Sequence, residues 1–115
     1  MARSNPVTVI AQHTSLVMRI EDLELFDLET GAPADLTSPD SVTFRFSVWD
    51  NNLKAPSGTA TEYSGNQEGS TNAWNAVHDC TTAGDFVWDC EVVEGSDKGR
   101  CALQHVTVNT SIADV

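Results

Sequence analysis

Basic residues are scarce in this sequence. Only six of the 115 residues are Lys or Arg, against seventeen Asp or Glu, so the formal net charge is −11 at pH 7. A chain with this charge repels phosphate groups, and we expect neither a nucleic-acid partner nor binding to an anionic membrane. The excess of acid suits high solubility, a saline habitat or a basic protein partner.

Long hydrophobic runs are missing as well. No stretch approaches the ~20 apolar residues of a membrane span, and the first six residues lack the apolar stretch of a signal peptide. We therefore expect a soluble protein that is made in a cytoplasm and not exported by that route. Its length and 40 % hydrophobic content fit one folded domain over residues 1–115. Residues 1–6 form an N-terminal arm and residues 109–115 a C-terminal tail, both candidates for ordering on a partner.

The sequence has only three cysteines, an odd number, at positions 80, 90 and 101. No pair has the C-x-x-C spacing of zinc or redox sites, and a secreted disulfide framework usually has an even count. We therefore favour free thiols. The alternative is a bridge between Cys90 and Cys101, which oppose each other if a hairpin turn centres near Ser96 and Asp97.

Apolar residues alternate with polar ones at the period of a β-strand. Residues 41–49 are the clearest case, with Phe44 and Phe46 on one face and Trp49 on the other. Residues 86–93 and about 100–108 alternate too, and the polar turn at 94–99 makes them an antiparallel hairpin.

Weaker alternation continues elsewhere. Residues 15–20 form a strand, and a change of parity predicts a bulge near Glu21 and Asp22. Residues 57–63 are a further strand. Residues 73–77 are read as a short strand, with a short helix capped by Ser70 as the alternative.

About seven short strands at this spacing predict an all-β, immunoglobulin-like antiparallel β-sandwich. The expected core is Leu16, Met18, Ile20, Val42, Phe44, Phe46, Val48, Phe86, Trp88, Val92 and Val106, with Trp74 beside it.

Residues arranged for catalysis are not found. The histidines at 13, 78 and 105 share no metal spacing and read as sheet residues, and no phosphate-binding loop occurs. The acidic turns at 27–31 and 50–52 are better explained as turn formers than as calcium ligands. We therefore expect no catalytic residues, no metal, no cofactor and no enzymatic activity.

Two aromatic residues are candidate partner contacts. Trp49 falls on the outer face of its strand, where a single exposed Trp is typical of a protein–protein contact. The alternative is that residues 51–56 cover it. Tyr63, like Trp49, is a candidate for stacking on a sugar.

The order of turn and strand motifs resembles a known family. The motifs are DLETGAPADLT at 27–37, VTF at 42–44, AGDF at 83–86, DKG at 97–99 and VTV at 106–108. Together they resemble the small immunoglobulin-like module of tailed-phage virions, similar to the N-terminal domain of phage upper baseplate proteins. In that family a Tyr usually stands where this chain has Phe86.

The resemblance implies a non-enzymatic virion component, assembled in a host cytoplasm, that docks on a larger symmetric assembly. Its place would be capsid decoration, head fibre or neck, or tail and baseplate. Its partners would be the major capsid protein or a tail or baseplate protein, with the chain a homo-oligomer or present in multiple copies. The alternative is a carbohydrate- or receptor-binding adhesion module on the virion surface.

Overall fold

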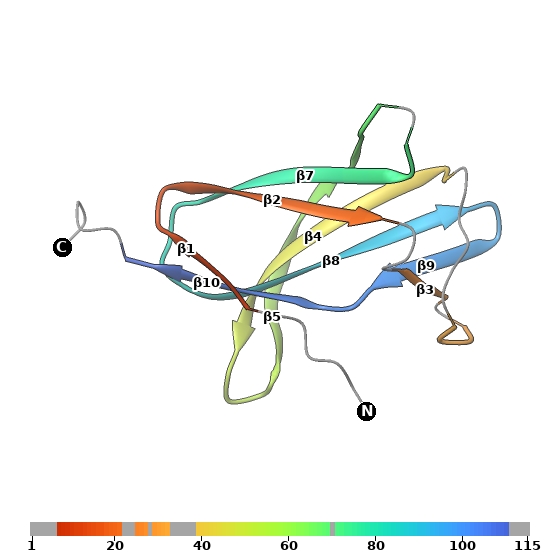
Figure 1. The fold of residues 1–115 in the computed structure, drawn as a ribbon. Helices are drawn as coiled ribbons and strands as arrows, with labels where there is room; N and C mark the ends of the chain where they lie inside the picture. Colours follow the sequence, from red (N-terminus) through yellow and green to blue (C-terminus); the bar gives the residue numbers. More distant parts are fainter. Residues whose placement is uncertain (1–6, 22–24, 28, 33–38, 70, 111–115) are drawn as a thin grey trace.

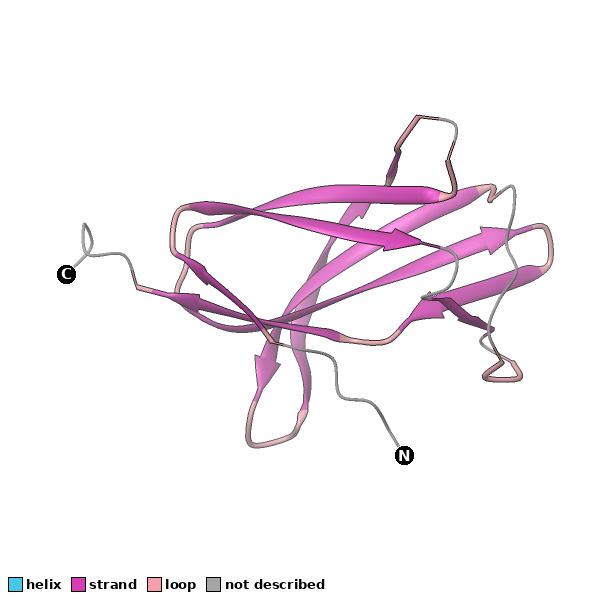
Figure 2. Cartoon of the chain, viewed as in Figure 1, coloured by secondary structure: helices cyan, strands magenta, loops and turns pink. Residues whose placement is uncertain are grey.

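The computed structural model describes residues 7–21, 25–27, 29–32, 39–69 and 71–110. These residues form strands joined by turns, and none of them is helical (Figures 1 and 2). The strands are β1 (Thr8–Ala11), β2 (Thr14–Glu21), β3 (Leu25–Asp27), β4 (Ser41–Asp50), β5 (Ala55–Ser64), β6 (Asn66–Gln67), β7 (Ala73–Cys80), β8 (Gly84–Glu94), β9 (Asp97–Cys101) and β10 (Gln104–Asn109).

Two sheets pack face to face (Figure 1). The large sheet has the order β1-β10-β8-β4-β5, with β9 pairing both β8 and β3, and the small sheet has the order β2-β7-β6. β1 runs parallel to β10, while the other pairs are antiparallel. This arrangement of two packed sheets confirms the predicted all-β sandwich.

The described residues hold ten strands where the sequence predicted about seven. Three of the additional strands, β1, β3 and β6, have only four, three and two residues, too few for alternation to show in the sequence. The predicted final strand is split, because residues 102–103 separate β9 from β10. The strand reading of 73–77 is confirmed by β7, whereas the bulge predicted at Glu21 and Asp22 extends outside the described residues.

The core lies between the sheets, and most of the predicted core is buried. The buried members are Leu16, Met18, Ile20, Val42, Phe44, Phe46, Trp88, Val92 and Val106. The prediction was wrong for Val48, which is 51 % exposed because it lines an open cleft between the ends of β4, β5 and β7. Phe86 and Trp74 are only partly buried at the margin of the core.

Gly65 carries the chain from the large sheet to the small one, between β5 and β6. Its N–H donates to the Val42 carbonyl oxygen at 2.8 Å. A Cβ at this position would lie 2.9 Å from Cγ1 of Val42 and 3.0 Å from Cε2 of Phe44. Such close approach to the core leaves room only for glycine.

The β8–β9 hairpin is tighter than the sequence predicted. Glu94 pairs with Asp97, so Gly95 and Ser96 alone form the turn, and Gly95 has a φ of +60°. The register sets Cys90 and Cys101 opposite each other on the two strands. Both side chains are buried thiols, and the Cys90 N–H donates to the Cys101 sulfur at 3.2 Å.

Candidate interaction face

The outer face of the large sheet carries most of the chemistry that the fold brings together. Alternation along β4 buries Phe44 and Phe46 between the sheets, so Arg45, Ser47 and Trp49 point to the opposite side. The neighbouring strands add to this face Val87, Asp89 and Glu91 from β8, Arg100 from β9 and His105 from β10.

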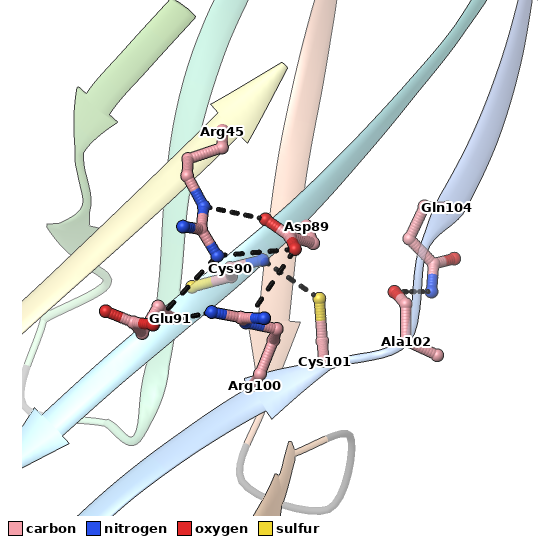
Figure 3. Close-up of polar contacts among 8 residues, drawn as sticks. All are labelled: Arg45, Asp89, Cys90, Glu91, Arg100, Cys101, Ala102 and Gln104. Atoms are coloured by element: carbon pink, nitrogen blue, oxygen red, sulfur yellow. Dashed lines mark hydrogen bonds and ion pairs between the residues drawn. The ribbon is translucent and has the colours of Figure 1, made fainter. Parts of the chain in front are cut away.

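Four charged side chains form a network across β4, β8 and β9 (Figure 3). Nε of Arg45 donates to Oδ1 of Asp89 at 3.1 Å, and Nη2 of Arg100 donates to Oε2 of Glu91 at 2.8 Å. Asp89 Oδ2 lies 3.9 Å from Nε of Arg100, and Glu91 Oε2 lies 4.0 Å from Nη2 of Arg45. The two arginines and the two carboxylates thus neutralise one another, although the chain as a whole has a formal net charge of −11.

The pKa shifts agree with this geometry. The hydrogen bond from Arg100 holds the pKa of Glu91 below its ordinary value, and the positive charge of Arg45 adds to the effect. Partial burial opposes the charged form of Arg45, but hydrogen bonding and the charge of Asp89 outweigh it and raise its pKa. The network therefore keeps its charges in place at neutral pH.

A hollow of about 280 Å³ lies beside the network. Val87 is part of its lining. The side chain of Val87 lies on the outer face of the large sheet, away from the core, yet it is only 1 % exposed. Its lining combines charged side chains with apolar ones: Arg45, Asp89, Arg100, Pro56, Ala60 and Leu103.

The Nε atom of Arg100 is buried beside this hollow, and it makes no hydrogen bond with the described residues. A buried N–H donor without an acceptor costs free energy.

Trp49 is half-buried on this face rather than fully exposed. Its ring meets His105 edge to face, with centroids 4.7 Å apart, and its backbone pairs with Pro56 of β5. A second hollow of about 170 Å³ adjoins the two rings and is lined also by Val7, Asn51 and Asp85. Trp49 therefore stays a candidate partner contact with part of its ring accessible.

Tyr63 lies elsewhere. It packs against the core, and its hydroxyl bonds to Nδ1 of His78 at 2.5 Å. Burial lowers the pKa of His78 and raises that of Tyr63, in each case disfavouring the charged form. The structure thus does not bring the two predicted aromatic contacts, Trp49 and Tyr63, onto one surface.

An open cleft of about 260 Å³ lies at the end of the sandwich where Val48 is exposed. Phe46 stacks between His78 and Phe86, with ring centroids 3.9 Å and 5.1 Å away, and all three rings line the cleft. Hydroxyl groups from β4, β5 and the loop between β7 and β8 complete it: Ser47, Thr59, Thr61, Thr81 and Thr82.

The two acidic turns form local hydrogen bonds. Oδ1 of Asp50 accepts from the N–H groups of Asn52 and Leu53, and Oδ1 of Asp27 accepts from those of Glu29 and Thr30. These are the contacts of turn-forming carboxylates. In the described part of the chain, no three His, Cys, Asp or Glu side chains gather as a metal site would require.

Sequence reasoning missed the charged network and the hollow. Arg45 shares the outward parity of Trp49, and Asp89 and Glu91 share an outward parity on their own strand, so these orientations were available. The sequence did not predict that β8 pairs with β4. The register between two strands that are distant in the sequence cannot be deduced from the residues of either strand alone.

Comparisons with protein families, curated proteins and solved structures find no match to this chain. Among the residues that the structure describes, no helix is long and apolar enough to cross a membrane.

Proposed function

We propose that this chain is a non-enzymatic structural component of a tailed-bacteriophage virion. It would dock on a larger symmetric assembly, on the capsid, neck or tail, through the outer face of its large sheet. The observation that carries the docking proposal is the composition of that face: a half-buried Trp, a hollow lined by both apolar and charged side chains, and two arginines held by carboxylates. Trp and Arg are the residue types that most often dominate binding energy at protein interfaces.

The positions of the motifs support the resemblance that suggests a virion. VTF lies inside β4, AGDF spans the start of β8, and DKG opens β9. The DLETGAPADLT motif is described only at Asp27 and at residues 29–32, and its remaining positions lie outside the described residues.

Attachment would come from surface burial repeated over many copies. A symmetric assembly presents the same site many times, so modest single contacts add up to lasting attachment. The net charge of −11 complements a basic shell or tail protein and speeds their encounter.

The first test is mass spectrometry of capsid and tail fractions purified separately from the phage that carries this sequence. We expect the chain in one of the two fractions, and its absence from both would contradict the proposal. Docking is then measured by co-sedimentation of the purified chain with that fraction. We expect Trp49→Ala to weaken binding by ~10-fold or more, as loss of an interface Trp does.

Val77→Ala is the matched control, because Val77 is exposed on the outer face of the small sheet. Equal binding by both variants and the wild type would exclude the large sheet as the docking face.

A second candidate function is a carbohydrate- or receptor-binding module, and the cleft beside Val48 favours it. The aromatic side chains of this cleft offer an apolar surface for stacking, and its Ser and Thr hydroxyl groups offer hydrogen-bond partners. A glycan array probed with the wild type and with Val48→Lys tests it. Binding that the substitution abolishes would support this role, and no binding to any glycan would count against it.

A further inference from the structure

The sheet edges differ in how they are protected against pairing with another chain. In the described ranges β6 has two residues and β1 has four. β5 carries Pro56, Gly58 with a φ of +76°, and a register shift against β4. Short strands, proline and bulges are the usual means of keeping an edge from pairing.

β2 has none of these features. Its eight residues include neither Pro nor Gly, and all eight pair with β7 in unbroken register. No other described strand pairs with β2. One row of its backbone N–H and C=O groups therefore faces away from the small sheet, as a ready template for a further strand.

The outward side chains next to this edge are apolar in the middle and polar on either side. Val17 is 58 % exposed and lies directly opposite Val77, which is 48 % exposed. On one side the Ser15 hydroxyl donates to Asp79 at 2.8 Å. On the other side Arg19 is bonded to Glu68 and Glu21.

We propose that β2 pairs antiparallel with β2 of a second copy of this chain, about a two-fold axis between the two Val17 residues. In this register Val17 opposes Val17, and Leu16 opposes Met18 on the core side. Ser15, with its bound Asp79, opposes Arg19 of the other copy. The resulting interface is self-complementary, as a closed two-fold dimer requires.

Other registers are worse. A shift by one residue sets the outward face of one strand against the core-facing side of the other. A shift by two in one direction sets Val17 against the charged Arg19, and in the other direction it sets Arg19 against His13. Only the register centred on Val17 joins the exposed valines of both copies and sets a carboxylate near each Arg19.

Each copy has a formal net charge of −11, and the repulsion between the two copies opposes their pairing. Salt screens such repulsion between exposed charges. We therefore expect a dimer that is weak at low salt and stronger at ~0.5 M NaCl.

Sedimentation velocity over a concentration series up to ~1 mM tests the dimer at that salt. We expect a monomer–dimer equilibrium in the wild type. Val17→Lys should raise the dissociation constant by ~10-fold or more, because two like charges then oppose each other across the axis. Val9→Lys should leave it unchanged, since Val9 is equally exposed, at 61 %, on β1 of the other sheet.

Oxidative cross-linking tests the register. The native thiols at 80, 90 and 101 are buried, so a cysteine introduced on the surface reacts alone. Val17→Cys should form a disulfide-linked dimer much faster than Val9→Cys does. A wild type that stays monomeric throughout, or equal cross-linking at both positions, would overturn the proposal. This outcome is separate from the docking test, which depends on Trp49 in the large sheet.

Discussion

The outer faces of the two sheets are built by the same alternation, yet they differ in how well their side chains are covered. On the large sheet, neighbouring strands on both sides of β8 bury Val87 and hold Asp89 between two arginines. On the small sheet, only β2 and β7 are long, and Val17 and Val77 stay exposed. A residue's parity in a strand thus decides its face, but the number of flanking strands decides its burial.

The sharpest test of this difference is a charge placed at the same residue type on each face. Val87→Asp should destabilise the fold by about 3–5 kcal/mol, because it buries a carboxylate without a partner. Val77→Asp should change stability by no more than about 0.5 kcal/mol, as exposed substitutions do. Urea unfolding of both variants measures this, and equal losses would show that the two faces do not differ.

A smaller effect is expected from the ion pairs. Asp89→Asn removes the carboxylate that lies between Arg45 and Arg100, and should cost about 1–2 kcal/mol. Arg19→Gln removes the hydrogen bond that Nε of Arg19 shares between the two carboxylate oxygens of Glu68. This pair on the small sheet is exposed, so the substitution should cause no measurable loss of stability. Thermal unfolding of both variants compares them. If Arg19→Gln lowered stability as much as Asp89→Asn does, exposure to solvent would not be what weakens these ion pairs.

The smallest effect is a dependence on pH. The pKa of Glu91 is lowered on folding by its hydrogen bond from Arg100. Above the ordinary pKa of a Glu this contact contributes its full stability, and the contribution is lost as the pH falls through the lowered value. Stability should therefore decline below about pH 4.5, less steeply in Glu91→Gln. Unfolding measured from pH 3 to 7 in steps of ~1 gives the dependence of stability on pH for the wild type and for Glu91→Gln. The same dependence in both proteins would show that Glu91 is not its cause.

Local patterns predicted what lies within single strands. The alternation of 41–46 and 86–92 gave the fold class and the buried residues, because a period of two dictates which side chains share a face. The hairpin at Gly95 followed from turn chemistry, although β9 begins earlier than expected.

The failures arise where distant strands meet. Val48 has the parity of a core residue, but it lines the open cleft at the end of the sandwich and stays half exposed. Val87 has outward parity, but side chains of other strands bury it. The network of Arg45, Asp89, Glu91 and Arg100 depends on a register that neither segment contains by itself.

The crossing at Gly65 is one of several points where the chain changes layer. From β1 to β2, β2 to β3, β5 to β6 and β7 to β8 it passes from one sheet to the other. Neither sheet is therefore a continuous piece of sequence, and each needs contacts between segments that are distant along the chain. We expect the protein to fold slowly and to melt in a single step, with no half of it able to survive a cut through the middle.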